Sequence, residues 1–375
     1  MDWWHKLKDN GLARGGAILL IIFYLAVIFA DFIAPYDPYK SWADGSLLPP
    51  TPVYWRSQAE SNKGQWLGPH VYPTIGSATD INTGERLLEE DFSQPSPLRL
   101  FVRGQPYNLF QVRLPLPPKW DEVTLFPGIP IDLHLFGTVG KGSIHLLGTD
   151  ESGRDQFSRI VFGGRISLFI GLVGILVSFP IGMFVGGISG YFGGPLDAVL
   201  MRFVEVLMTI PGIYLLVALA AVLPPGLSSS QRFLLIVLIT SFISWAGLAR
   251  VIRGQVLSLK EQEFIQAAKA LGANPLYIIV RHVLPQTASY IIISATLAIP
   301  GFIVSESVLS LIGLGIQQPD PSWGNLLSLA NNASIIVLQP WLIWPTTLLI
   351  VLTVLAFNLL GDGLRDALDP RTLDR

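Results

Sequence analysis

The 375-residue sequence contains no cysteine, which excludes both a disulfide framework and a metal site built on thiolates. Charged residues are scarce: they make up 14% of the chain, against about 25% in soluble domains, whereas 50% of the residues are hydrophobic. The five histidines are scattered, and no two of them stand at a metal-ligand spacing such as i, i+4. The net charge of −2 gives no indication of a nucleic-acid partner. This composition predicts a membrane protein with several spans.

Six apolar segments are long enough, or nearly so, to cross the ~30 Å hydrocarbon core of a bilayer as helices. The expected spans are 15–35, 165–191, 206–223, 233–249, 287–311 and 341–361. A cleavable signal peptide is the alternative for the first, but no small-x-small cleavage site precedes Asp37-Pro38, so we expect a retained helix. Basic residues before the first span, after the fourth and after the sixth favour a cytoplasmic location for both termini.

Residues 36–145 differ in kind, because they are rich in proline and aromatic residues and contain no run able to span. Alternating stretches at 98–103 and 109–116 predict β-strands broken by Gly-Gln-Pro and Pro-Leu-Pro-Pro turns. We expect a small, mostly β, extracytoplasmic domain. Its tryptophans are of the type enriched at binding hot spots, although any of them could equally fill a β core: Trp55, Trp66 and Trp120.

The stretch 258–285 is too polar to cross a bilayer, yet it lies between the fourth and fifth apolar segments. Ser258 and Glu261 have the spacing of a capping box, which predicts a helix start at Ser258. Gly272 can end that helix in the left-handed conformation, and Asn274-Pro275 can begin another. The pattern predicts two short helices at the membrane surface, with an ordinary amphipathic loop as the alternative. The apolar residues expected on one face of the first helix are Phe264, Ala268 and Leu271.

Within this stretch, Gln266-Ala267-Ala268, Gly272 and Leu284-Pro285 resemble the EAA loop of bacterial ABC import permeases in sequence and spacing. In that family the loop forms a coupling helix that docks into a cleft on the cytoplasmic ATPase. Gln266 stands where the family usually has Glu, so the hydrogen-bonding capacity is kept but the charge is lost, and His282 stands where Ile is most frequent. The resemblance implies an ATPase-coupling role for Phe264, Gln266, Ala267, Ala268, Leu271, Gly272, Leu284 and Pro285.

Three further strings are similar to signatures of the C-type permease subunit of the oligopeptide, dipeptide and nickel ABC importers. They are Ala34–Pro38 (APYDP), Leu147–Arg159 (LGTDESGRDQFSR) and Gly313–Asn325 (GLGIQQPDPSWGN). The resemblance implies the type I ABC importer permease fold in a bacterial inner membrane: an all-α polytopic protein with six transmembrane helices, here carrying the mostly β insertion.

The chain then divides into four parts. These are a cytoplasmic N-terminus with the first helix (1–35), an extracytoplasmic insertion (36–145), a core bundle (146–361) containing the elbow 258–285, and a cytoplasmic tail (362–375).

Small residues and one acid mark the expected spans. Gly182, Gly186 and Gly190 recur at i, i+4 and give the second span a smooth face, suited equally to packing within the chain or to a subunit interface. Pro211-Gly212 predicts a kink in the third span. Glu306 lies in the fifth span, where a buried acid indicates either a place on a transport pathway or a structural hydrogen-bonding role.

The resemblance implies a non-catalytic permease subunit that moves peptides or a similar small solute. Its implied partners are a homologous permease in a heterodimer, two ABC ATPase domains that carry ATP and Mg, an extracytoplasmic solute-binding protein and membrane lipid. We expect no cofactor, metal or ATP site on this chain, since GTVGKGS at 137–143 lacks phosphate-loop spacing. A self-sufficient channel or secondary transporter is the alternative, but it calls for inverted repeats or several intramembrane charges.

Overall fold

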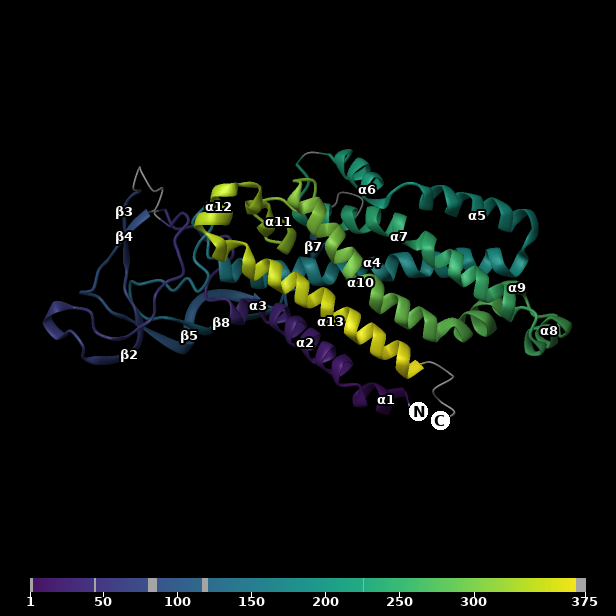
Figure 1. Ribbon diagram of the computed structural model, residues 1–375, viewed down its shortest axis with the longest axis horizontal. Helices are drawn as coiled ribbons and strands as arrows, with labels where there is room; N and C mark the ends of the chain where they lie inside the picture. Colours follow the sequence, from purple (N-terminus) through teal and green to yellow (C-terminus); the bar gives the residue numbers. More distant parts are fainter. Residues whose placement is uncertain (1–2, 44, 80–85, 117–120, 225, 369–375) are drawn as a thin grey trace.

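The computed structural model describes residues 3–43, 45–79, 86–116, 121–224 and 226–368. It shows an elongated bundle of helices with a β-rich domain at one end (Figure 1). We call this the insertion end, and the opposite end, where α8 lies, the elbow end. Trp120 and the predicted tail beyond Leu368 lie outside the described residues.

The helices of the bundle agree with the predicted spans in place but are mostly longer. Their bounds are α1 Trp3–Asp9, α2 Gly11–Ile28, α3 Ala30–Ile33, α4 Gln156–Phe192, α5 Gly194–Thr209, α6 Gly212–Ala221, α7 Ser229–Leu259, α8 Glu263–Ala270, α9 Pro275–Ile278, α10 Ala288–Leu311, α11 Trp323–Leu327, α12 Ala333–Leu338 and α13 Trp344–Leu368. Five helical segments of the described chain are long and apolar enough to cross a membrane, and the bent pair α5–α6 makes a sixth if it is one span.

Local chemistry explains where these helices begin and bend. The helix α4 begins at Gln156, earlier than the expected Arg165, because the Asp155 carboxylate accepts the Ser158 N–H and caps it. The third span breaks by 85° between α5 and α6 at the predicted proline, since Pro211 has no N–H to continue the helix. The helix α13, which corresponds to the expected sixth span, continues past Gly361 to Leu368.

The core of the bundle is organised around α4. It packs along the length of α7 on one side, while α10 also lies against it and α13 fills the space between α10 and α2 (Figure 1). The central hydrophobic cluster draws on most of these helices and includes Leu168, Ile236, Ile303 and Phe357. Such a cluster is formed by contacts between helices, while the outer faces stay apolar, as expected for a chain that also faces lipid.

The described residues of the insertion form eight strands: β1 Tyr54–Arg56, β2 Trp66–Val71, β3 Thr74–Thr79, β4 Arg86–Glu90, β5 Ser96–Leu109, β6 Val112–Leu116, β7 Asp121–Phe126 and β8 Ile129–Thr138. Four of them form an antiparallel sheet in the order β1-β2-β5-β8, and β3–β4 and β6–β7 form two separate hairpins. The mostly β prediction is confirmed. The predicted Gly-Gln-Pro turn is wrong: 104–106 is a register irregularity inside β5, and the strand ends instead where Phe110 takes a positive φ of 61°.

A stem joins the sheet to the bundle. The backbone of 42–51 pairs with 145–153 through Trp42 N–H to Gly153 O (3.1 Å), Leu47 N–H to Asp150 O (3.0 Å) and Thr51 N–H to His145 O (2.9 Å). The insertion therefore leaves and re-enters the bundle through one hydrogen-bonded base.

Candidate functional site

The elbow between α7 and α10 is the first candidate site. The helix α7 ends at Leu259, so Ser258 lies in its last turn and the predicted capping box does not form; α8 begins at Glu263 instead. Gln262 has an extended backbone and is the N-cap of α8, so the second helix starts only after it. The other end of the elbow is as predicted. Gly272 adopts a φ of +78°, and the Asn274 side chain accepts the Leu276 N–H at 2.9 Å to begin α9.

The second half of the elbow is continuous with the fifth span. From α9 the chain passes through a π-helical turn (279–283) and a 3-10 turn (284–287) into α10, so 275–311 forms one helical rod. Leu284 is half-buried and Pro285 is exposed at this junction. The part of the elbow after Gly272 therefore continues into α10 without a break.

One face of α8 is held by the bundle. Ile265 is fully buried in a cluster with Ile252, Val256 and Ile278, and Ala268 packs against that cluster as a half-buried residue. The sequence predicts one apolar face for Phe264, Ala268 and Leu271, but in the structure Ala268 packs against the bundle while the other two side chains are exposed. The side chains three residues apart on α8, Ile265 and Ala268, both pack toward α7. This contact anchors α8 on the bundle.

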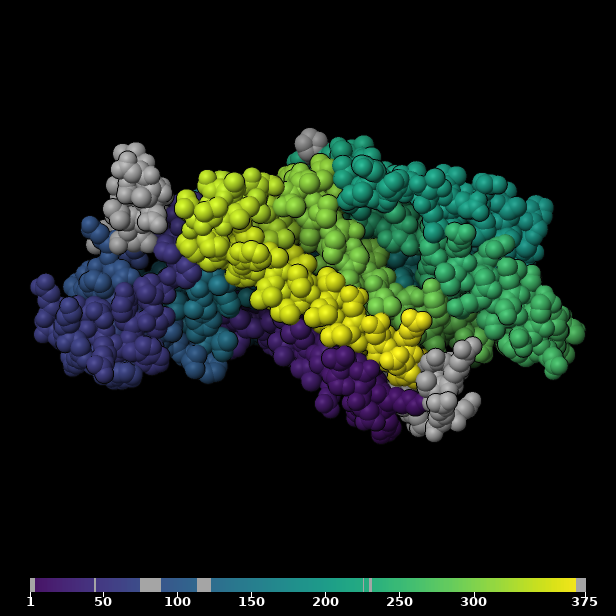
Figure 2. Space-filling model, in the orientation of Figure 1, coloured from purple at the N-terminus to yellow at the C-terminus, as the bar shows by residue number. Residues whose placement is uncertain are grey.

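The opposite face of α8 is apolar and exposed. Leu271 is 88% exposed and Phe264 is 44% exposed, and Ala267 lies on the same outward side. Leu276 and Tyr277 of α9, the next helix of the elbow, are also exposed. We call these five residues the elbow patch. It lies at the far tip of the molecule, where Figure 2 shows the green end of the chain projecting beyond the other helices. Exposed apolar residues gathered at a projecting tip are typical of an interaction site.

Gln266 closes the turn between α7 and α8. Its side-chain amide donates a hydrogen bond to the Lys260 carbonyl oxygen at 2.9 Å. A glutamate at this position has no proton to donate at neutral pH. The departure from the usual family residue thus has a structural counterpart within the chain.

Two further contacts attach the elbow end to neighbouring helices. The Lys269 ammonium lies 5.1 Å from the centre of the Tyr191 ring of α4. Arg253 of α7 donates two hydrogen bonds to the Asp197 carboxylate of α5, at 2.5 and 2.6 Å. These contacts link α8 to α4 and α5 to α7 at the elbow end.

The glycine stripe of the second span faces α7 of the same chain. A Cβ placed at Gly182, Gly186 or Gly190 would lie 2.9, 2.4 or 2.8 Å from the carbonyl oxygens of Trp245, Ala249 and Arg253. The backbones of α4 and α7 therefore touch along three turns. Of the two roles open from sequence, the structure has the stripe packed within the chain.

Glu306 is fully buried near the insertion end of α10. Its carboxylate accepts hydrogen bonds from the hydroxyls of Ser310 (2.7 Å) and Ser167 of α4 (3.1 Å), and Ser167 in turn accepts the Trp323 N–H of α11 at 3.0 Å. The acid therefore links three helices through hydroxyl groups. This arrangement favours the structural role over a place on a transport pathway.

The structure reveals a polar cluster whose residues lie in the three signature strings. No role for these residues was predicted from the sequence. Arg159 of α4 is fully buried and lies 3.3 Å from the Asp150 carboxylate. It donates to the Gln318 side-chain oxygen (2.7 Å) and to the carbonyl oxygens of Pro319 (3.0 Å) and Pro38 (3.1 Å). The three signature strings at 34–38, 147–159 and 313–325 thus meet at one arginine. The charged and polar residues within these strings were the sequence signal that could have indicated such a cluster.

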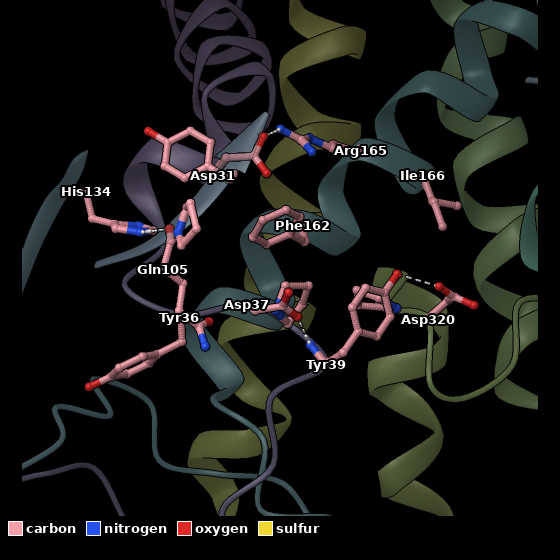
Figure 3. A pocket seen from close by; sticks show the side chains of 14 residues that line it. Asp31, Tyr36, Asp37, Tyr39, Gln105, His134, Phe162, Arg165, Ile166 and Asp320 are labelled. Atoms are coloured by element: carbon pink, nitrogen blue, oxygen red, sulfur yellow. Dashed lines mark hydrogen bonds and ion pairs between the residues drawn. The ribbon is translucent and has the colours of Figure 1, made fainter. Parts of the chain in front are cut away.

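A polar pocket of about 350 Å³ lies beside this cluster (Figure 3). Its polar groups largely satisfy one another: Asp31 pairs with Arg165 at 2.5 Å, and the Tyr39 hydroxyl donates to Asp320 at 2.5 Å. Burial raises the pKa of Tyr36 to about 12, and its oxygen accepts the Ile144 N–H at 2.8 Å. The pocket thus lies between the insertion and the bundle, with residues from both in its lining. In the described part of the chain, no group of three or more His, Asp or Glu residues could hold a metal ion.

The elbow and the three meeting signatures can now be set beside known proteins. The family model for the binding-protein-dependent transport system inner membrane component matches residues 178–374, just over half of the chain. The chain belongs to this family. A second model, the N-terminal TM domain of oligopeptide transport permease C, matches residues 1–50. The predicted family, fold class and permease function are confirmed, and the channel alternative is not favoured.

Two named relatives, both bacterial peptide permeases, support the same family. The chain is 43% identical over 227 residues to the oligopeptide transport system permease protein OppC of Haemophilus influenzae, covering 60% of this chain and 70% of that protein. It is 43% identical over 229 residues to the dipeptide transport system permease protein DppC of Bacillus subtilis, covering 60% and 69%. Among solved structures, an inward-facing MetNI methionine ABC transporter matches with 18% identity and a TM-score of 0.40, covering 57% of this chain and 94% of that one.

Proposed function

We propose that this permease subunit forms, with a homologous subunit, the translocation path of an ATP-driven importer for peptides. The observation that carries the coupling role is the elbow patch, which is exposed on a helix anchored by Ile265 and Ala268. The peptide class rests on the similarity to oligopeptide and dipeptide permeases. ATP and Mg would act on separate ATPase subunits, and this chain would do no bond chemistry.

The proposed mechanism is mechanical. Closure of the ATPase dimer pushes on the elbow patch, and α8 transmits the displacement in two directions. Toward α7 it acts through the Gln266–Lys260 hydrogen bond, and toward α10 it acts through the continuous helical rod 275–311. Because α4 touches α7 along the glycine stripe, the two helices tilt together. The tilt opens the path alternately to each side of the membrane.

The insertion is proposed to lie on the side from which a binding protein delivers solute. Its β1–β2 tip presents Trp55 and Trp66, which are each more than half exposed and have ring centroids 5.6 Å apart. Both side chains are too exposed to fill the β core, and tryptophan is enriched at interface hot spots. We infer that this pair contacts the binding protein, while the elbow contacts the ATPases.

Transport by the reconstituted complex tests both ideas. The chain, purified with its permease and ATPase partners and placed in liposomes, should take up short peptides only when ATP and loaded binding protein are present. Replacing both Trp55 and Trp66 with Ser should weaken stimulation by the binding protein about 30-fold, since a hot spot contributes about 2 kcal/mol. Lys141→Ser is the matched control, since Lys141 is exposed on the same insertion but follows β8, outside the β1–β2 tip.

Three results would contradict the proposal. Uptake without ATP would support the channel alternative. Uptake of sugars or nickel but not of peptides would replace the solute class. Unchanged stimulation of the double tryptophan variant would remove the docking role from the β1–β2 tip while leaving the importer function intact.

The orientation is tested separately, because the parent chain lacks cysteine. Ser93→Cys, which lies in the insertion, and Asp9→Cys, which lies at the end of α1, are both exposed. In intact spheroplasts an impermeant thiol reagent should label the first and spare the second, and both should react after lysis. Labelling of Asp9→Cys in intact cells would reverse the proposed topology.

A further inference from the structure

An apolar groove of about 700 Å³ separates the C-terminal half of α2 from the face of β5 and β8. The groove is lined by Ile22, Leu25, Ala26, Phe29, Phe32, Ile33, Tyr107, Leu109, Ile131, Leu133 and Leu135. Tyr107 is the one polar side chain in this set, and its hydroxyl already donates to the Leu133 carbonyl oxygen at 2.6 Å. The lining therefore suits an apolar ligand and not a peptide, whose backbone would need partners.

The sheet face of the groove arises from strict alternation along β8. Ile131, Leu133 and Leu135 point toward α2, while Asp132 lies 3.9 Å from Arg103 and His134 faces the carbonyl oxygens of Ala34 and Gln105. The opposite, polar side of the β5–β8 strand pair includes His134 and Gln105 and borders the pocket in Figure 3. The paired strands β5 and β8 thus have an apolar face that is turned toward α2.

Aromatic contacts hold the two walls together. The rings of Phe29 and Phe110 lie 5.4 Å apart, and those of Phe32 and Phe101 lie 6.2 Å apart. Each pair joins the end of the membrane helix to the sheet. The groove is therefore a fixed feature between two elements that are already in contact.

The groove continues the lipid-facing surface of α2. Ile18, Ile21, Ile22 and Leu25 are each about half exposed on a helix long and apolar enough to span, and the last two also line the groove. From Ile22 to Ile33 the helical rise is about 16 Å, which is half of the ~30 Å hydrocarbon core and so about one leaflet. A lipid beside α2 would extend its chain into the groove.

We propose that this groove binds an acyl chain of a membrane phospholipid from the leaflet on the insertion side. The paired strands β5 and β8 are then membrane-associated, and part of the insertion contacts the bilayer. Exposed apolar residues beyond the groove fit the same environment: Phe110 and Ile129 at its rim, and Leu125 and Phe126 on the β6–β7 hairpin, whose β6 strand lies against α7. The inference depends on α2 spanning the membrane and not on the coupling role of α8.

The test uses the full chain in liposomes that contain a phosphatidylcholine with a photoactivatable diazirine near the end of one acyl chain. After illumination, cross-linked peptides are identified by mass spectrometry. We expect cross-links to the β8 peptide at 129–138 as well as to the α2 peptide. Ala26→Trp fills the groove from the helix side, and it should reduce cross-linking of β8 to background while cross-links to the Ile18 region persist.

Leu176→Trp is the matched control, because Leu176 is 73% exposed on α4 and belongs to none of the groove lining. It should leave the β8 cross-links unchanged, and gel filtration should show both variants to be folded. The proposal is overturned if β8 is not cross-linked while α2 is, or if Ala26→Trp leaves the β8 signal intact. Cross-linking of β8 to a copurifying polypeptide in place of lipid would overturn it as well.

Discussion

Replacing Leu271 with Asp is expected to weaken ATPase association by at least about 30-fold, while the protein still inserts and folds. The side chain is 88% exposed, so its loss removes little packing within the chain, and we expect a stability change within about 0.5 kcal/mol. In the proposed complex the same side chain enters an apolar cleft, where an unpaired carboxylate is desolvated. A cost of at least about 2 kcal/mol corresponds to about 30-fold weaker binding.

The measurement is copurification of the ATPase subunits together with solute-stimulated ATP hydrolysis. Val139→Asp is the matched control, since Val139 is an exposed aliphatic side chain directly after β8 in the insertion, outside the elbow patch and the membrane spans. It should bind and stimulate the ATPases like the parent. Normal coupling in Leu271→Asp would remove the elbow patch as the docking surface. Ala268→Glu is a poorer test, because Ala268 packs against the buried Ile265 cluster and a charge there disturbs the fold itself.

Replacing Gly186 with Ala separates α4 from α7. The added Cβ would stand 2.4 Å from the Ala249 carbonyl oxygen and 3.0 Å from the Ile252 Cβ, and the nearer of these is backbone that cannot rotate away. We expect a loss of about 1–3 kcal/mol in unfolding free energy, the usual cost of overpacking. The effect should appear as a lower midpoint of thermal unfolding in detergent.

Gly254→Ala in α7 is the matched control. A Cβ at Gly254 meets nothing within 4 Å, so alanine should be neutral or stabilise the helix by up to about 1 kcal/mol. The contrast separates close backbone packing from helix propensity. If both glycine variants unfold at the same temperature, the stripe does not fix the distance between α4 and α7.

The three signature strings show how far motif recognition reaches. Each was visible in the sequence, and together they indicated a family that the comparisons confirm. Their physical purpose was not visible, because Arg159 draws its partners from Pro38, Asp150 and Gln318, which are far apart along the chain. A buried arginine is stable only where all of these acceptors converge. That convergence is a property of the folded bundle.

The elbow shows the same division on a smaller scale. Gly272 and Asn274 behave as predicted, because left-handed glycine and asparagine caps depend on a few neighbouring residues. The predicted start at Ser258 is wrong, since the packing of α7 on α4 extends that helix to Leu259 and overrides a local cap. The exposed face was partly wrong for a related reason: Phe264 and Leu271 face outward, but Ala268 is turned toward the bundle by the buried Ile265.

The sequence by itself determined that this is a helical membrane protein with a mostly β insertion, where its helices fall and to which family it belongs. Those properties follow from apolar length, turn residues and short motifs, all of which act locally. Only the tertiary structure decided that the Gly182–Gly190 stripe contacts α7, that Glu306 binds serines of two helices, and that an apolar groove lies between α2 and β8. Each of these depends on which surfaces meet, and a periodic pattern shows only that a face is small, polar or apolar, not what covers it.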